Sequence, residues 1–576
     1  MYWFTSDILF TPKKVVQIKL DFEKIVLAVF FGILLFIGPG NLFGHKIMHD
    51  FPYGYYASDP FQHQIRAEAI KDAGNFKYEA FYISRGFDNI VGRYPPLLYH
   101  IAVIFSYSSG LEVYDSIYFV VMFFAIIAAL VMYFIIRDFN KRVALISLPI
   151  TILMISHPVN TTSLFFPLNS QFSTGFIFGH WPSMLAQFFL VAFTWCVMKL
   201  DLEKSYIFIS IILISILLTH TSEAVFAGIF LVVLVLSKWL NKNLSRRDLK
   251  KIGIFLAISF IAVAYYIIIF KYTWAGSQPY TFSVDPIWNG NPGFYIFGFG
   301  ILLIFIIIGI FASLTQLKNI HVSLVFGFSM LLAGFMNYIG FQLRSFQIRF
   351  FWPIYLSVFF GFGIYFVLRL IIKNWNMTYS LALFAVFSVL ILGIIKIPGI
   401  AHYSNYPNSA GLMDQYHWES LKWISGNTEK KSKILFFYGD IYSQDALLRN
   451  TKRSHYQVDT DEFVKSLQEK KIERNYVSEI PGDTGGGTME RTGLFSFHDP
   501  SQDKPNSYFF GPHDICGFDY LVFDKVSNTL VLAQYNLLIA NDLLKKDFIK
   551  IAFENQVVVI LKNTNIGADC IEERNF

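Results

Sequence analysis

The stretch YDSIYFVVMFFAIIAALVMYFII spans residues 114–136 and is followed directly by RDFNKR, residues 137–142. A helix needs about 20 consecutive apolar residues to cross the hydrocarbon core of a bilayer, and this stretch is long enough. Cytoplasmic loops are enriched in lysine and arginine, so Arg137, Lys141 and Arg142 indicate the cytoplasmic end. Together the two segments predict a transmembrane helix of defined orientation.

The composition of the whole chain agrees with this prediction. Hydrophobic residues make up 54% of the 576 residues and charged residues 15%, and the mean hydropathy is +0.46. A soluble domain carries about a quarter charged residues. We therefore exclude a soluble cytosolic enzyme, a disordered scaffold and a disulfide-stapled secreted domain, and predict a polytopic α-helical membrane protein.

Further apolar segments that cross the membrane, or are nearly long enough to do so, are 25–44, 143–157, 181–199, 205–220, 223–239, 251–270, 294–314, 321–340, 350–371 and 378–397. With 114–136 they predict about eleven transmembrane helices. Basic residues follow every second span, most densely over 238–251. This pattern places the lysine-rich N-terminus in the cytoplasm and the C-terminal part of the chain outside.

The segment PPLLYHIAVIFSYSSG (95–110) is also apolar. If it crossed the membrane, one of the flanking basic clusters would lie outside, against the positive-inside trend. We therefore predict a surface or re-entrant segment on the outer face, inside a long first external loop over residues 45–113.

Charge divides the chain into two parts. Residues 1–400 contain 28 basic and 17 acidic residues, whereas residues 401–576 contain 19 basic and 24 acidic. We predict a transmembrane domain over 1–400 and a soluble extracytoplasmic domain over 401–576. The net charge of +6 does not indicate a nucleic-acid partner, because the excess basic residues flank apolar spans, where they serve as topology signals.

The C-terminal part has the pattern of a small mixed α/β domain. Runs typical of strands are KILFFYGD (433–440), DYLVFD (519–524) and NQVVVILKN (555–563). Runs with helical spacing are HWESLKWISGN (417–427), TDEFVKSLQEKK (460–471) and NLLIANDLLKKDF (536–548). Cys516 and Cys570 could form a disulfide in an oxidising compartment or remain two free thiols, and the sequence leaves both open.

The first external loop holds the best candidate for a functional site. SDPFQHQIRAEAIKDAG (58–74) predicts a helix with Ser58 or Asp59 near its N-cap and Pro60 at its first position. On this helix Asp59, His63 and Arg66 have i, i+4, i+7 spacing and share one face. Such a face could bind an acceptor and an anionic donor. The alternative is a solvated amphipathic helix on which Asp59 serves only as a cap.

Asp50 lies shortly before this helix. If Asp50 and Asp59 converge, a divalent cation such as Mg or Mn could bind between them, because hard cations take oxygen ligands. The alternative is that Asp50 is a loop residue in a turn.

Other polar residues lie at the outer ends of predicted spans, where the bilayer makes them costly. His180 begins a span in FGHWPSMLA, and His220 and Glu223 lie in LLTHTSEAVF. Each could contact a ligand or be a hydrogen-bonded interfacial residue. Arg344 and Arg349 in FQLRSFQIRFFWP lie on the outer side, against the positive-inside trend. We infer an anionic partner for them, and a phosphate suits the guanidinium fork.

Taken in order, these features resemble the GT-C superfamily of integral membrane glycosyltransferases, which use polyprenyl-phosphate-linked sugars. Protein O-mannosyltransferases, the lipid A aminoarabinose transferase and the catalytic subunits of oligosaccharyltransferases belong to it. The matching segments are SDPFQHQIRA with Asp59, RYPPLLYH, RDFNKR (137–142) and RFFWP (349–353), which looks like the Arg-Tyr-x-x-Pro start of a late helix in those enzymes.

The start of the C-terminal part adds a partial similarity. WESLKWISGNTEKKSKILFFYGD (418–440) is similar to the beginning of the external domain of oligosaccharyltransferase subunits. Their Trp-Trp-Asp-Tyr-Gly motif is replaced here by FFYGD (436–440). This departure argues against protein N-glycosylation and favours a simpler transferase.

The resemblance implies an inverting glycosyltransferase that moves a sugar from a polyprenyl-phosphate carrier to a lipid, glycan or protein acceptor. Asp59 would be the general base, and Arg349 and Arg344 would hold the phosphate leaving group. The implied acceptor or donor contacts are His63, Arg66, His180, His220 and Glu223. Many family members have a second acidic residue beside the first, whereas Pro60 follows Asp59 here, which leaves the metal question open.

Two other classes remain possible from the sequence. A transporter would also have many helices, but its sites usually lie at the bilayer midplane and its halves repeat. No second copy of the 45–113 loop is present, and the polar residues lie at helix ends. A non-catalytic envelope protein that binds a partner through residues 401–576 would leave Asp59 and Arg349 without a role.

Overall fold

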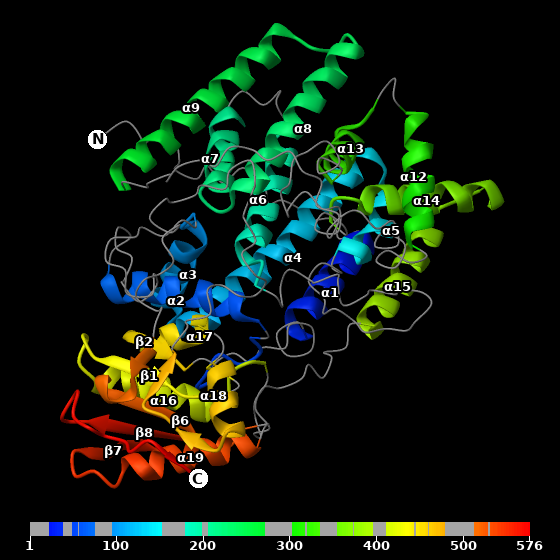
Figure 1. Cartoon of the computed structure of the whole chain (residues 1–576). Coiled ribbons are helices and arrows are strands. Elements are labelled where there is room, and N and C mark those ends of the chain that lie inside the picture. Colours follow the sequence, from blue (N-terminus) through cyan, green and yellow to red (C-terminus); the bar gives the residue numbers. More distant parts are fainter. Residues whose placement is uncertain are drawn as a thin grey trace.

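Figure 1 shows the computed structural model of the chain. The structure describes residues 22–37, 49–55, 57–74, 95–151, 179–198, 205–270, 302–316, 320–334, 354–372, 374–394, 411–439, 441–442, 445–458, 460–477, 512–527 and 530–576. Helices fill the N-terminal part, and a smaller unit with a sheet follows it. The expected boundary at residue 400 lies outside the described residues.

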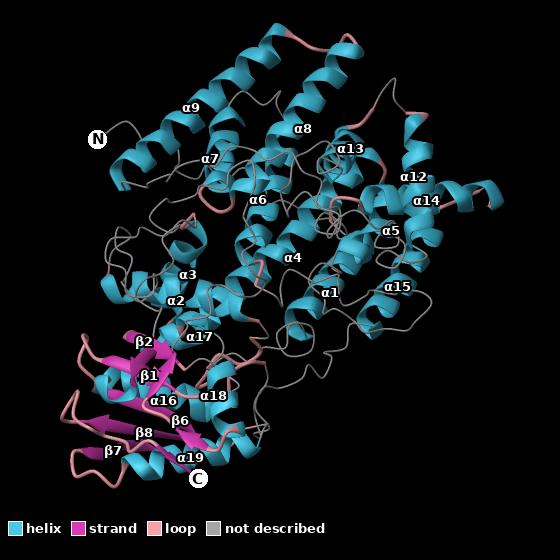
Figure 2. Ribbon diagram, viewed as in Figure 1, coloured by secondary structure: helices cyan, strands magenta, loops and turns pink. Residues whose placement is uncertain are grey.

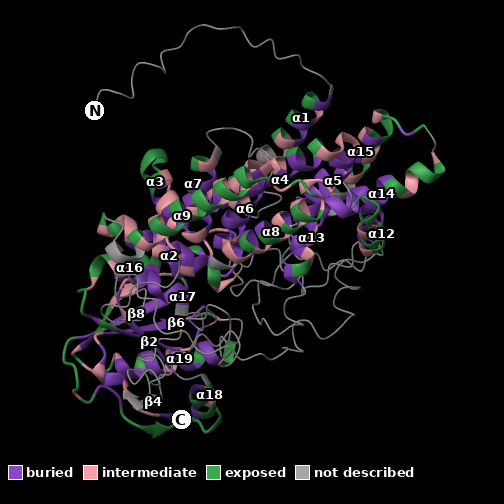
Figure 3. Cartoon of the chain, turned by 90° about the horizontal axis from the view of Figure 1, so that it is seen from above, coloured by how far each residue is buried: buried purple, intermediate pink, exposed green. Residues whose placement is uncertain are grey.

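The helical part contains a series of helices in chain order. They are α1 (Phe22–Ile37), α2 (Ser58–Ala73), α3 (Leu97–Ser109), α4 (Val113–Phe139), α5 (Lys141–Thr151), α6 (Trp181–Met198), α7 (Ser205–Leu217), α8 (Thr221–Leu240), α9 (Arg246–Phe270), α12 (Leu302–Leu314), α13 (Val322–Gly334), α14 (Ser357–Ile371) and α15 (Met377–Ile394). Buried residues concentrate on α4, α5 and α6, whereas α9 is largely exposed (Figure 3).

Within the described residues, three helices are long and apolar enough to cross a membrane: Val113–Phe139, Trp181–Met198 and Glu223–Leu240. Several other apolar helices, including α7, α12, α13 and α14, are shorter. The expected number of about eleven crossings is therefore not confirmed. The first of the three is the helix predicted from residues 114–136.

The outer surface of the helical part carries large apolar side chains. Phe260 on α9 is 75% exposed, and Ile261 and Phe208 are also exposed. A soluble monomer rarely exposes apolar residues in this way, whereas lipid-facing helices do so routinely. This distribution agrees with a membrane protein.

The basic cluster after α4 is tied to the start of α1. The Nε of Arg137 donates to Glu23 at 2.7 Å, and Lys141 forms an ion pair with the same carboxylate. The hydroxyl of Tyr133 also donates to Glu23. The start of α1 and the end of α4 thus lie at the same end of the helical part, as the expected topology requires.

Helix α3 corresponds to the predicted surface or re-entrant segment. It has 13 residues, which at a rise of 1.5 Å per residue span about 20 Å, less than the roughly 30 Å of a hydrocarbon core. It packs against α2 and α4 and exposes Ile104 and Tyr107. The apolar segment 95–110 thus forms a short helix that contacts both α2 and α4.

The C-terminal unit is built on a five-stranded mixed sheet with strand order β2-β1-β6-β8-β7 (Figure 2). Strands β2 (Ser454–Gln457), β1 (Lys433–Phe436) and β6 (Tyr520–Asp524) run parallel to one another. Strand β8 (Val558–Asn563) is antiparallel to both of its neighbours, β6 and β7 (Ile549–Glu554). The helices of this unit are α16 (Gln415–Asn427), α17 (Asp445–Leu448), α18 (Thr460–Gln468) and α19 (Leu530–Leu543), with short 3-10 turns η8 (Arg449–Thr451) and η10 (Ile515–Gly517). Short strands pair β3 (Lys471–Ile472) with β9 (Arg574–Asn575) and β4 (Asn475–Val477) with β5 (Pro512–Asp514).

The predicted mixed α/β character of this part is confirmed. The three strand-type runs form β1, β6 and β8, and the three helical runs fall in α16, α18 and α19. Helix α19 begins at Leu530, earlier than the predicted 536, because Leu532 and Tyr535 extend its buried face.

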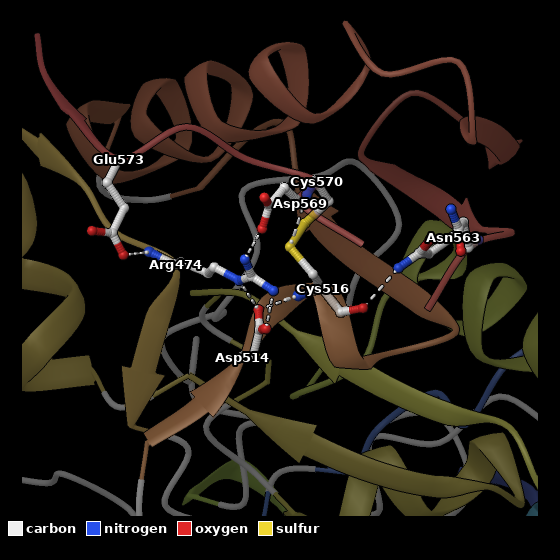
Figure 4. Close-up of a disulfide and its surroundings, with 8 residues drawn as sticks. Arg474, Asp514, Cys516, Asn563, Asp569, Cys570 and Glu573 are labelled. Carbon is white, nitrogen blue, oxygen red and sulfur yellow. Dashed lines mark hydrogen bonds and ion pairs between the residues drawn. A yellow bond between two sulfur atoms is a disulfide. The ribbon is translucent and has the colours of Figure 1, made fainter. Parts of the chain in front are cut away.

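A disulfide joins Cys516 and Cys570, with a Cα–Cα distance of 5.6 Å, so the two cysteines are paired (Figure 4). Arg474 lies beside it and donates to Asp514 from Nε at 2.7 Å, and it also contacts Asp569. The disulfide and these ion pairs fasten the C-terminal end of the chain to the unit.

Candidate functional site

The site is built around the first turn of α2. This helix begins at Ser58 with Ala57 as its N-cap, and no side chain caps it. Ser58 and Asp59 lie near the N-cap, as predicted, but the helix begins at Ser58 and not at the predicted Pro60. Pro60 lies inside the first turn, where it is tolerated because its missing N–H would lack a helical partner anyway. Asp59 is exposed, and a negative charge is favoured at this end of a helix.

His63 lies one turn further along α2 and is buried. Its Nδ1 is 3.0 Å from the hydroxyl of Tyr99 on α3. The pKa of His63 is lowered to about 3, mainly by burial and secondly by the nearby Arg66 cation. A hydrogen bond with the backbone of Gly179 opposes this shift. His63 is therefore neutral at physiological pH and offers one donor and one acceptor.

Gly179 lets the first turn of α2 approach the start of α6. Its φ is +80°, and a Cβ there would lie 2.4 Å from Cδ of Pro60 and 2.7 Å from Cβ of Asp59. Any other residue would be strained in its backbone and would collide with α2. Gly179 thus brings Asp59 next to His180 and Trp181, which follow it in the chain.

A buried carboxylate lies at the turn between α7 and α8. Glu223 is 1% exposed; it accepts a hydrogen bond from the hydroxyl of Ser183 on α6 at 2.5 Å, and it pairs with His220. Glu223 also acts electrostatically on Tyr355, just before α14.

Several helix ends therefore meet in one place. Arg66, His180 and His220 all act electrostatically on His63. The N–H of Leu97 at the start of α3 donates to the carbonyl of Leu218 at the end of α7, at 2.9 Å. The structure brings together residues that the sequence analysis selected from separate segments.

Aromatic rings fill the base of this cluster. The ring of Trp181 contacts those of Tyr55 at 5.2 Å, Tyr118 at 6.0 Å and His63 at 6.2 Å. Tyr55 also packs against Phe61 of α2 at 5.0 Å. This layer holds the imidazole and the first turn of α2 against α4 and α6.

The other predicted site residues are Asp50, Arg344 and Arg349. Asp50 is exposed and acts electrostatically on Tyr114 at the start of α4. Arg344 and Arg349 lie outside the described residues. No group of three or more His, Cys, Asp and Glu side chains that could hold a metal ion occurs in the described part of the chain.

Tyr99, Gly179, Ser183 and Tyr355 were not selected from the sequence. A tyrosine, a glycine or a serine beside an apolar run is too common to indicate a site. The only available signal was position, since each lies within a few residues of a predicted outer helix end.

No known family model matches the chain, and no curated protein sequence does so either. Solved structures with a similar fold include ArnT and an archaeal oligosaccharyltransferase. ArnT from Cupriavidus metallidurans in the apo state has a TM-score of 0.51 at 11% identity, over 96% of this chain and 100% of that one. The oligosaccharyltransferase of Archaeoglobus fulgidus in complex with Zn and sulfate has a TM-score of 0.50 at 14% identity, over 75% of this chain.

The chain spans 62% of the length of that oligosaccharyltransferase. At these identities the likeness concerns the fold. The fold defines a helical membrane protein with a C-terminal α/β unit. The likeness to ArnT and to this oligosaccharyltransferase agrees, at the level of the fold, with the resemblance found in the sequence.

Proposed function

We propose that this protein is an inverting glycosyltransferase that moves a sugar from a polyprenyl-phosphate carrier to an acceptor on the outer face of the membrane. The acceptor would be a lipid, a glycan or a protein. The observation that carries the proposal is the exposed Asp59 carboxylate at the start of α2, which Gly179 brings close to the cluster of His63, His180, His220 and Glu223.

In the proposed reaction, Asp59 accepts the proton of an acceptor hydroxyl. The acceptor oxygen attacks the anomeric carbon while the bond from that carbon to the phosphate oxygen breaks. The carrier leaves as the polyprenyl phosphate, and the anomeric configuration inverts because the displacement is direct. A base must be accessible to its acceptor, and the exposure of Asp59 meets this requirement.

Arg349 and Arg344 are the proposed ligands of the leaving phosphate. A guanidinium offers two parallel donors to phosphate oxygens and keeps its charge at any physiological pH. His63, Arg66, His180, His220 and Glu223 are the proposed contacts to donor or acceptor.

Asp50 and Asp59 are also proposed as a pair of ligands for a divalent cation. We assign no step to it, because the described residues do not form a group of three or more potential ligands. Titration of the purified protein with Mg²⁺ or Mn²⁺, followed by calorimetry on wild type and Asp50→Asn, measures whether the pair binds.

The disulfide between Cys516 and Cys570 supports an extracytoplasmic position of the C-terminal unit, since disulfides persist in oxidising compartments. The N-terminus would then be cytoplasmic. With this orientation, the cluster around Gly179 lies on the side where lipid-linked sugars are proposed to arrive.

The test is transfer from polyprenyl-phosphate sugars by the purified protein. Asp59→Asn keeps the size of the side chain and removes its proton affinity, so transfer should fall about 10²–10⁴-fold in a protein that still folds. Glu112→Gln, at an exposed position just before α4, is the control and should retain activity. Near-normal transfer by Asp59→Asn together with a loss in Asp50→Asn would move the base to Asp50.

Substitutions of Arg349 provide a second test of the proposed function. Arg349→Lys keeps the charge but loses the fork, so it should be nearly as damaging as Arg349→Ala, by roughly one to two decades. Full activity of the lysine variant would indicate an arginine that only reaches the headgroups. If the wild type bound no polyprenyl phosphate, with any of several sugars, a transporter or a non-catalytic envelope protein would be the better interpretation.

A further inference from the structure

The C-terminal unit contacts α2, the helix that carries Asp59, near its end, and it also contacts the segment just before this helix. Both contacts join segments that are hundreds of residues apart in the sequence, and Figure 1 shows α2 and α17 side by side above the sheet. The first contact lies just before α2 and the second lies near its end.

The first contact is a backbone bridge between Tyr55 and Gly411. The N–H of Leu412 donates to the carbonyl of Tyr55 at 2.7 Å, and the two strands run parallel there. Gly411 has a φ of +97°, and a Cβ at this position would lie 2.2 Å from the carbonyl oxygen of Tyr55. Only glycine fits both the backbone conformation and the close approach.

Tyr55 transmits this contact to the site. Its hydroxyl donates to the carbonyl of Tyr114 at 2.7 Å, and its ring packs against Phe61 and Trp181. Tyr55 also lies only three residues before α2 begins at Ser58. A displacement of Tyr55 would therefore move the first turn of α2 against Gly179.

The second contact is ionic. Lys452, which follows η8, forms an ion pair with Asp72, and its Nζ is 3.4 Å from Oε1 of Glu68. Lys422 on α16 lies 3.9 Å from the same Glu68 oxygen. Glu68 is 8% exposed and Lys452 has a φ of +54°. A lysine is rarely held in this backbone conformation, which is maintained only where its surroundings determine it.

We propose that the C-terminal unit is a positioning element for the transferase site. It holds α2 at its start through Gly411 and Tyr55, and near its end through Lys452, Glu68 and Asp72. Asp59 and His63 then keep their places relative to Gly179 and Tyr99. The proposal concerns α2 itself, and its effect on catalysis rests on the proposed function.

The test compares Gly411→Ala with Gly426→Ala in the full-length protein. Gly411→Ala introduces the collision and the strain described above. Gly426 lies inside α16, where an added Cβ meets nothing within 4 Å, so Gly426→Ala is the matched control. Hydrogen exchange of the amides of α2, followed by mass spectrometry, reports the positioning directly, and turnover of a polyprenyl-phosphate sugar reports its consequence.

We expect faster exchange in α2 and unchanged exchange in the middle of α4 for Gly411→Ala. Its kcat should fall roughly 10²-fold, the loss typical of a small displacement of reacting groups, with little change in KM. The control should behave as wild type. Unchanged exchange in α2 would overturn the proposal, and so would faster exchange with full turnover.

The ionic contact gives a variant that does not depend on Gly411. Lys452→Ala removes the ion pairs with Asp72 and Glu68 and should loosen α2, whereas Lys452→Arg keeps the charge and should retain slow exchange and turnover. Lys465→Ala, in the exposed pair with Glu462 on α18, is the control and should have no effect. Unchanged exchange of α2 in Lys452→Ala would also count against the proposal.

The two proposals fail in different ways. If the wild type transfers no sugar from any donor, the proposed function fails, and the exchange data alone decide whether the C-terminal unit positions α2. If the wild type is active and the exchange of α2 is insensitive to Gly411 and Lys452, only the positioning proposal fails.

Discussion

Replacing His417 with glutamine should destabilise the C-terminal unit in a pH-dependent way. His417 on α16 is 3% exposed, and its ring joins two buried carboxylates. Nδ1 lies 2.6 Å from Asp414, the N-cap of α16, and Nε2 lies 2.9 Å from Asp524 at the end of β6. An imidazolium can donate to both carboxylates, whereas a neutral ring can donate to only one.

The structure sets the size of the effect. Burial alone would lower the pKa of His417, but Asp524 and Asp414 outweigh it and raise that pKa from 6.5 to about 10. At about 1.4 kcal/mol per pKa unit, the rise corresponds to up to about 5 kcal/mol of stability. Burial also raises the pKa of Asp524, so part of the proton affinity belongs to that carboxyl. Removing one partner of a buried ion pair typically costs about 3–5 kcal/mol, which agrees.

The sign follows from the raised pKa of His417. Its contribution is complete below the unfolded pKa of about 6.5 and is lost as the pH rises through about 10. His417→Gln should therefore cost about 3–5 kcal/mol near pH 6. The difference from wild type should shrink by up to about 1.4 kcal/mol for each pH unit above 7.

The assay is thermal unfolding of the purified full-length protein in detergent between about pH 6 and pH 10, at one scan rate because membrane proteins often unfold irreversibly. Asn563→Ala is the control, since Asn563 is equally buried at 3% and its amide donates to the carbonyl oxygen of Cys516 at 2.9 Å. A side-chain amide does not titrate, so the cost of this substitution should not change with pH. An equal cost of His417→Gln at both ends of the pH range would refute the charged bridge.

Two further predictions concern the disulfide and the topology. The Cys516→Ser, Cys570→Ser double variant should lose about 4 kcal/mol of stability, because the bond closes a loop with a sequence separation of 54; an unchanged melting temperature under reducing and oxidising conditions would contradict this. In a Cys196→Ser background, Ser245→Cys should be protected from an impermeant maleimide in intact cells, and Lys431→Cys should be labelled. Both positions are exposed in the structure, so labelling of both or of neither would contradict the proposed orientation.

The sequence by itself determined the features that depend on local composition. The apolar run at 114–136 with its basic end predicted α4, and alternating strand and helix patterns after residue 411 predicted the α/β unit. These features depend on the burial of neighbouring side chains, which repeats with the period of the helix or the strand and can be seen along the chain. The face of α2 with Asp59, His63 and Arg66 was visible for the same reason.

Only the tertiary structure decided which distant segments meet. The pairing of Cys516 with Cys570, the bridge from His417 to Asp524 and the approach of Gly179 to Asp59 each join separate elements. Periodicity says which face of an element is buried, but it does not say what covers that face. The start of α2 also differs from the sequence prediction, since the helix begins at Ser58 and not at Pro60. Contacts between elements are determined by packing of the whole chain, and no local pattern encodes them.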